Sequence, residues 1–200
     1  FADDGPTVTV NVTNEAGVVL LTQDAQTIGG ASDTAVSTGN FSSVFSNTPV
    51  SGADSPATTT MSYTLSTVGG DSNLDSNGAS INLYNVSGVI VGSTAGSVGA
   101  ITTGNTIFSI AVDGTGIVTL TQHQQIDHPI AGDPSATATP FEDHLAVLGS
   151  GLVSLTATAL TTDFDGDTAT NSNSVDLGGN VRFADDGPTV TVNVTNEAGV

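Results

Sequence analysis

The chain begins and ends with the same eighteen residues. FADDGPTVTVNVTNEAGV occupies residues 1–18 and returns unchanged at residues 183–200, an offset of 182 residues. Identity over this length, in register, indicates that the chain was taken from a tandem array. Both copies of one segment cannot occupy the same place in one fold. The sequence therefore predicts one repeat over residues 1–182, with residues 183–200 forming the first strand of the next repeat.

Short runs of alternating apolar and polar residues predict an all-β domain. The alternation is clear in TVTVNVT (7–13), MSYTLST (61–67) and GLVSLTATALTTD (151–163). Asp113-Gly114-Thr115 separates two further runs and predicts a hairpin. Aromatic residues make up only 4% of the chain, so Val, Ile, Leu and Thr must fill the core, and these residue types suit strands.

We therefore expect an Ig-like antiparallel β-sandwich with long polar loops and no amphipathic helix. The alternative is a parallel β-helix, which would show short internal repeats, and none is present in the sequence. Further strands are expected at 18–22, within 81–93 around a Ser87-Gly88 turn, and at 174–183 with a bend at Gly178-Gly179. Long loops are expected at 29–60, 69–78 and 127–145.

The charge of the chain restricts its partners. Twenty acidic residues face a single basic residue, Arg182, and there is no Lys. Nucleic acid and anionic membrane surfaces are excluded as partners because both need Lys and Arg to bind phosphate. Cys is absent, so no disulfide or thiol chemistry is available. Charged residues total only 10%, and the acids are clustered, which indicates discrete sites that metal cations could neutralise.

The segment TDFDGDTAT (162–170) is the clearest candidate metal site. Asp163, Asp165 and Asp167 alternate, so on an extended strand neighbouring carboxylates would stand about 6.6 Å apart on one face. Gly166 permits a tight bend that would bring them together. Converging carboxylates repel one another unless a cation lies between them, and Ca²⁺ prefers oxygen ligands of this kind. The alternative interpretation is an acidic turn without an ion.

The duplicated segment carries a second acidic motif, an Asp-Asp pair followed by Gly-Pro. The two copies supply Asp3, Asp4, Asp185 and Asp186, so acids flank both ends of the predicted repeat junction. The adjoining acidic pair strengthens the interpretation of the acidic turn as a calcium site. A weaker candidate lies in the predicted loop 69–78, where the acids are Asp71 and Asp75.

Several motifs resemble the extender repeats of giant bacterial RTX adhesins that are secreted by the type I system. FADDGPTV follows DFDGDTAT, and LVSLTATA lies upstream of both. GIVTLTQHQQIDHP and LAVLGSGLVSLTATA also look like that family, and the resemblance extends over residues 101–190.

The resemblance implies a bacterial Ig-like β-sandwich on the cell surface, joined end to end with identical repeats, that holds a distal ligand-binding domain away from the cell. It also implies that Ca²⁺ stiffens the linkers, with ligands among Asp163, Asp165, Asp167, Asp185 and Asp186 and with Asp3 and Asp4 as the matching positions at the other end. Other domains would bind the host or surface ligand and so produce adhesion and biofilm formation.

No pattern in the chain predicts catalysis. His123, Asp127, His128, Glu142, Asp143 and His144 could be gathered into a zinc site, but their spacing matches no recognised ligand pattern, so we interpret the His residues as loop residues. A nucleophile elbow and a P-loop are also missing. The expected function is therefore a structural extender. The alternative is a repeat that itself binds a carbohydrate or a protein on the target surface.

Overall fold

The computed structural model describes residues 4–27, 34–128 and 145–185. These residues form strands joined by short 3-10 turns, and no α-helix occurs among them. They also contain no helix long and apolar enough to cross a membrane. The strands are β1 (Thr7–Val12), β2 (Leu20–Gln23), β3 (Ala35–Asn40), β4 (Phe45–Val50), β5 (Thr58–Thr67), β6 (Gly70–Ser76), β7 (Ala79–Val86), β8 (Val89–Ser93), β9 (Thr106–Val112), β10 (Ile117–Gln122), β11 (Ala146–Val147), β12 (Val153–Thr162), β13 (Thr168–Asp176) and β14 (Val181–Ala184). The 3-10 turns are η1 (Glu15–Gly17), η2 (Asp24–Thr27), η3 (Ser42–Val44) and η4 (Val98–Ala100).

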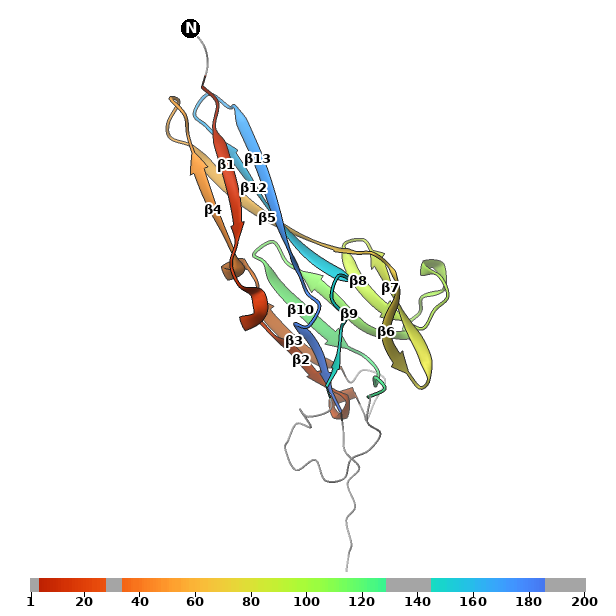
Figure 1. Ribbon diagram of the computed structural model, residues 1–200. Helices are drawn as coiled ribbons and strands as arrows, with labels where there is room; N and C mark the ends of the chain where they lie inside the picture. The colour runs from red at the N-terminus through yellow and green to blue at the C-terminus, as the bar shows by residue number, and fades with distance from the viewer. Residues whose placement is uncertain (1–3, 28–33, 129–144, 186–200) are drawn as a thin grey trace, which may run out of the picture.

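The strands form an antiparallel β-sandwich, which confirms the expected fold class and rules out the parallel β-helix (Figure 1). One sheet has the order β3-β10-β9-β8-β7-β6, and a second has the order β13-β12-β5. Two smaller sheets, β1-β4 and β11-β14-β2, complete the described part, and β14 with β2 is its parallel pair.

Side chains attach the β1-β4 ribbon to β13 in place of a backbone ladder. The Val10 N–H donates to Asn171 Oδ1 at 2.9 Å, and Asn173 Nδ2 donates to the Val10 carbonyl at 3.2 Å. The first strand of the chain is therefore held to the penultimate strand, which Figure 1 shows side by side with it along one end of the molecule.

The core lies between the sheets and follows the predicted alternation. Along β12 the inward residues Val153, Leu155, Ala157 and Ala159 are all fully buried, while their neighbours are partly exposed. Removing such apolar surface from water is the main force that holds the layers together. Phe41, Phe108 and Phe183 are fully buried in this core, where the ring centroids of Phe108 and Phe183 lie 5.2 Å apart.

Two segments that the sequence predicted as loops contain strands. Within 29–60 the structure has β3 and β4, and within 69–78 it has β6. The alternation in β6 is hidden because small polar residues take inward positions: Ser72 Oγ donates to the Ile81 carbonyl at 2.7 Å, and Ser76 Oγ donates to the Gln125 carbonyl at 2.7 Å. β4 shows no pattern because all of its residues after Phe45 are exposed.

The predicted strand 174–183 is in fact two strands in different sheets. Gly178 and Gly179 break it between β13 and β14, and a Cβ on Gly178 would lie 2.3 Å from the Ser150 Cα. β14 extends to Ala184, and both Phe183 and Ala184 are fully buried. The last strand of this domain therefore includes two residues beyond the expected boundary at 182, and residues 186–200 lie outside the described part.

The long axis of the domain ends in two poles (Figure 1). At the N-terminal pole, Asp4 leads into β1 beside the β4–β5 loop and the β12–β13 turn. At the C-terminal pole, β14 ends at Ala184, and Asp185 follows it near η2. Each pole holds a cluster of potential metal ligands.

Candidate metal centres

The β12–β13 turn brings Asp163, Asp165 and Asp167 together. Gly166 takes a φ of 103°, a backbone conformation that side-chain-bearing residues rarely adopt. The turn is closed by the Asp163 N–H, which donates to the Asp167 carbonyl at 3.0 Å. One carboxylate oxygen from each Asp lies within 4.8 Å of the other two. Gly166 thus produces the convergence that the alternating spacing alone would not give.

Asp163 is the buried member of this turn. It is only 7% exposed, and its Oδ1 accepts hydrogen bonds from the N–H groups of Gly166 at 3.2 Å and Asp167 at 2.8 Å. Its Oδ2 is buried without a hydrogen-bond partner. Burial, with a further contribution from neighbouring Asp165, raises the pKa of Asp163. A buried carboxylate oxygen with no donor is costly, and a bound cation would satisfy it.

The N-terminal linker lies against this turn. A Cβ on Gly5 would stand 3.7 Å from Asp167 Oδ2, and a Cβ on Gly52, in the β4–β5 loop, would stand 2.1 Å from the Asp4 carbonyl oxygen. The β4–β5 loop in turn joins the acidic turn, because the Phe164 N–H donates to the Asp54 carbonyl at 3.2 Å. The structure therefore brings predicted site residue Asp4 to the same pole as the acidic turn, while Asp3 lies outside the described residues.

A second cluster occupies the C-terminal pole and consists of Asp24, His128 and Asp185. One ligand atom from each lies within 4.8 Å of the others. Asp24 is 2% exposed. Its carboxylate accepts hydrogen bonds from Gln122 Nε2 and, at 3.1 Å, from the Ile126 N–H, and it lies 3.4 Å from His128 Nε2. Hydrogen bonds from within the domain therefore already support this carboxylate.

Sequence reasoning missed Asp24 and interpreted His128 as a loop residue. Asp24 follows an apolar run with no other acid near it in the sequence, so only the parallel pairing of β2 with β14 brings it beside Asp185. That pairing joins residues that are far apart in the chain and carries no local signal. Asp186, the other member of the predicted pair, lies outside the described residues.

The predicted junction ligands are thus divided between two poles within this domain. Asp163, Asp165 and Asp167 lie with Asp4, whereas Asp185 lies with Asp24 and His128. In a tandem array Asp185 of one copy corresponds to Asp3 of the next, so the two clusters would flank the same linker from opposite sides.

Neither Asp71 nor Asp75, the weaker candidates, belongs to a cluster of three or more potential metal ligands in the described part of the chain. Both lie on β6, which is bulged between them, with Asn73 at a φ of 59°. Asp71 Oδ1 accepts a hydrogen bond from the Asn73 N–H at 2.8 Å, so it stabilises the bulge. Asp75 pairs with Ser80 of β7.

The other residues considered for a zinc site are dispersed. His123 Nε2 lies 3.5 Å from Ser109 Oγ, and burial lowers the pKa of His123. Asp127 accepts hydrogen bonds from the N–H groups of Asn77 and Gly78, at 2.9 and 2.7 Å, and thereby caps the β6–β7 turn. Glu142, Asp143 and His144 lie outside the described residues.

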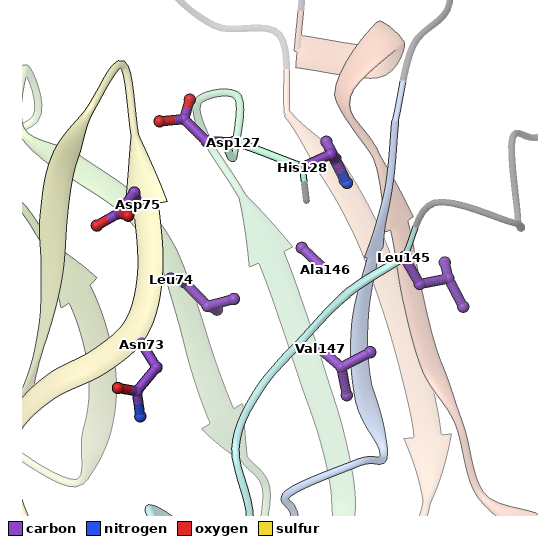
Figure 2. A pocket seen from close by; sticks show the side chains of 8 residues that line it. All are labelled: Asn73, Leu74, Asp75, Asp127, His128, Leu145, Ala146 and Val147. Atoms are coloured by element: carbon purple, nitrogen blue, oxygen red, sulfur yellow. The ribbon is translucent and has the colours of Figure 1, made fainter. Parts of the chain in front are cut away.

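A pocket of about 320 Å³ lies between β6 and β11 (Figure 2). Its lining consists of Asn73, Leu74, Asp75, Asp127, His128, Leu145, Ala146 and Val147. Figure 2 shows the Leu74 side chain extending toward Ala146 and Val147, while the carboxylates of Asp75 and Asp127 point away toward the rim. No Phe, Tyr or Trp lines this pocket, and the His128 imidazole is its one ring.

Residues 19–178 match the model of a family described as a domain of unknown function, DUF5801. The match includes the acidic turn, Asp24 and His128, and it ends before β14. Comparison with curated proteins and with solved structures gave no match.

Proposed function

Because the chain belongs to the DUF5801 family, whose description assigns no function, we propose from its own geometry that it is a calcium-dependent extender repeat. In this proposal each repeat is a structural unit of a tandem array on the bacterial cell surface, and calcium at the junctions holds neighbouring repeats in line. The array carries a distal ligand-binding domain away from the cell.

The observation that carries the proposal is the unpartnered, buried Oδ2 of Asp163 within a cluster of three carboxylates. The chain has no Lys and a single Arg, so its own cations cannot neutralise this cluster. The donors are all oxygens, which fit Ca²⁺ better than a soft metal. Asp163, Asp165 and Asp167 would hold the ion, and calcium would supply the charge that offsets their repulsion.

The place of the acidic turn supports a mechanical role. Asp4 and Gly5, which lead into β1, lie against the β4–β5 loop and beside Asp167. Neutralising the turn would remove the repulsion between the linker acids and the domain that follows them. The linker would then lie fixed on the pole, so that the direction of one repeat determines the direction of the next.

Calorimetric titration of the chain with CaCl₂ tests the binding step. We expect a dissociation constant of about 10⁻⁴ to 10⁻³ M, the range of extracellular calcium modules. The Asp165→Asn variant should bind at least about tenfold more weakly, since it loses one of few charged ligands. Asp71→Asn is the matched control, because Asp71 is exposed and lies in β6, outside both ligand clusters. Equal binding by both variants would contradict the assignment of the turn.

Small-angle scattering of a four-copy protein tests the mechanical step. We expect the maximum dimension to be largest in calcium and to decrease when EDTA is added. A four-copy protein with the same scattering in both conditions would refute stiffening, even if calcium binds. The expected alternative, a repeat that itself binds a carbohydrate or protein, predicts a clear hit for the isolated repeat on a glycan or surface-binding array.

A further inference from the structure

The N-terminal pole exposes a large apolar side chain at the centre of its acidic turn. Phe164 is 77% exposed, although its neighbour Asp163 is buried. Val50, the last residue of β4, is 56% exposed. Both residues border the β4–β5 loop, because Val50 precedes that loop and the Phe164 N–H donates to Asp54 within it. Isolated exposed apolar residues are common, so the place of Phe164 matters more than its exposure.

In a tandem array, the duplicated segment determines which part of the preceding repeat lies next to the N-terminal pole. β14 ends at Ala184, and Ala184 of one copy is Ala2 of the next. Ala2 and Asp4 are two residues apart, which is at most about 7 Å of extended chain. Asp4 itself lies against the β4–β5 loop. The C-terminal pole of the preceding copy must therefore lie close to the pole that exposes Phe164.

We propose that Phe164 packs against the C-terminal pole of the preceding copy and forms the apolar centre of the contact between repeats. The partner is thus a second copy of this chain, connected in series. That pole also offers exposed apolar surface: Val36 is 58% exposed and follows Ala35, which pairs with Gln122 beside Asp24. The inference rests on the tandem arrangement in the proposed function but does not require calcium.

The contact would have an apolar centre with a polar rim, which is the usual arrangement of protein interfaces. On one repeat the rim would include the exposed Asp165 and Asp167 beside Phe164, and on the other repeat it would include Asp185, which follows β14. Packing of Phe164 would exclude water from the space between these groups. It would also limit rotation about the short linker, which charge neutralisation alone does not do.

The test uses the absence of Trp from the chain, which makes a single introduced Trp a unique reporter. In a two-copy protein, residues 1–182 followed by residues 1–200, Phe164→Trp is placed in the second copy or, as a matched control, in the first. Only the second copy has a preceding repeat. Acrylamide quenching and the emission maximum are measured in calcium for each protein and for the single-copy variant.

We expect the second-copy Trp to be quenched about twofold less than the first-copy Trp and to emit at shorter wavelength, since water is excluded around it. The first-copy Trp should match the single-copy variant. Equal quenching in all three proteins would overturn the inference.

Phe164→Ser in the second copy gives an independent readout. It should decrease the maximum dimension of the two-copy protein in small-angle scattering. Val68→Ser is the control and should leave this dimension unchanged, because Val68 is 74% exposed on the β5–β6 connection.

The outcomes separate this inference from the proposed function. A shielded second-copy Trp in a protein that does not bind calcium would support the contact and refute the calcium extender. Calcium binding by the single copy together with equal quenching in both copies would refute the contact and leave the calcium site standing.

Discussion

The two poles hold clusters of similar size but of opposite character. At the C-terminal pole, Asp24 is buried and accepts hydrogen bonds from Gln122 and Ile126, with His128 close by. At the N-terminal pole, Asp163 is also buried, but one of its oxygens has no partner and its neighbours are two further acids. The two buried carboxylates therefore differ: both oxygens of Asp24 accept hydrogen bonds, whereas Asp163 Oδ2 accepts none. For this reason the N-terminal cluster is the one that we expect to bind a cation.

Replacing Asp24 gives the largest expected effect and tests whether the C-terminal cluster is structural. Asp24→Ala should lower the free energy of unfolding by about 3 kcal/mol, because the buried Ile126 N–H would lose its acceptor and Gln122 Nε2 would keep only the Gln124 carbonyl. Urea unfolding measures the loss, and Asp71→Ala provides an exposed control that loses only the hydrogen bond from the Asn73 N–H and should cost about 1 kcal/mol or less. A similar loss of unfolding free energy in Asp24→Ala and Asp71→Ala would show that the C-terminal cluster does not stabilise the fold.

Calcium should distinguish the poles directly. At a concentration 100-fold above its dissociation constant, calcium should raise the free energy of unfolding by about 2.7 kcal/mol. We expect this gain to be largely lost in Asp165→Asn and retained in Asp24→Asn, each measured by thermal unfolding with and without EDTA. The reverse result, with the gain lost only in Asp24→Asn, would transfer the calcium site to the C-terminal pole.

Replacing Gly166 tests the backbone conformation of the acidic turn, and the expected change in stability is smaller. Gly166→Ala should cost about 1 kcal/mol, because Ala disfavours a φ of 103°. No atom lies within 4 Å of the added Cβ, so the cost is conformational and not steric. Gly114→Ala is the matched control, since Gly114 also has open space around it and lies in the β9–β10 turn. An unchanged stability for Gly166→Ala would show that the turn is not held in this conformation.

His123 should give the smallest effect, a change in the free energy of unfolding with pH. This contribution must be subtracted before any pH dependence of stability is assigned to the acidic clusters at the poles. Burial lowers its pKa below the ordinary value of 6.5. The unfolded chain therefore binds more protons just below pH 6.5, and stability should decrease as the pH falls from 6.5 toward the folded pKa. His123→Gln should flatten this part of the curve of unfolding free energy against pH. A curve with the same slope in the variant would assign the slope to another group.

The sequence predicted the parts of the fold whose signals are local. β12 alternates without interruption, and the hairpin of β9 and β10 turns at Asp113 and Gly114, so both were recognisable from a few residues. β6 was missed because Ser72 and Ser76 face the interior and satisfy their hydroxyls there. Burial of a hydrogen-bonded serine leaves no trace in an apolar pattern.

The candidate sites divide in the same way. The acidic turn was found because its ligands lie within five consecutive residues, around one Gly that can bend the chain. The cluster of Asp24 with His128 and Asp185 depends on long-range pairing of β2 with β14, which no local pattern reports. The expectation that Asp163 and Asp185 belong to one junction can hold only between copies, because a single domain places them at opposite poles.

The buried Phe183 and Ala184 have a consequence for how the proposed array would change length. The domain ends inside the duplicated segment, so the sequence period and the folded unit are out of phase by a few residues. A break anywhere in that segment, rejoined at the equivalent point of another copy, regenerates the same eighteen residues. Each remaining domain then keeps a complete β14, and the domain that follows it keeps a complete β1. In the tandem array of the proposed function, recombination within this segment would therefore add or remove whole units without disrupting a domain.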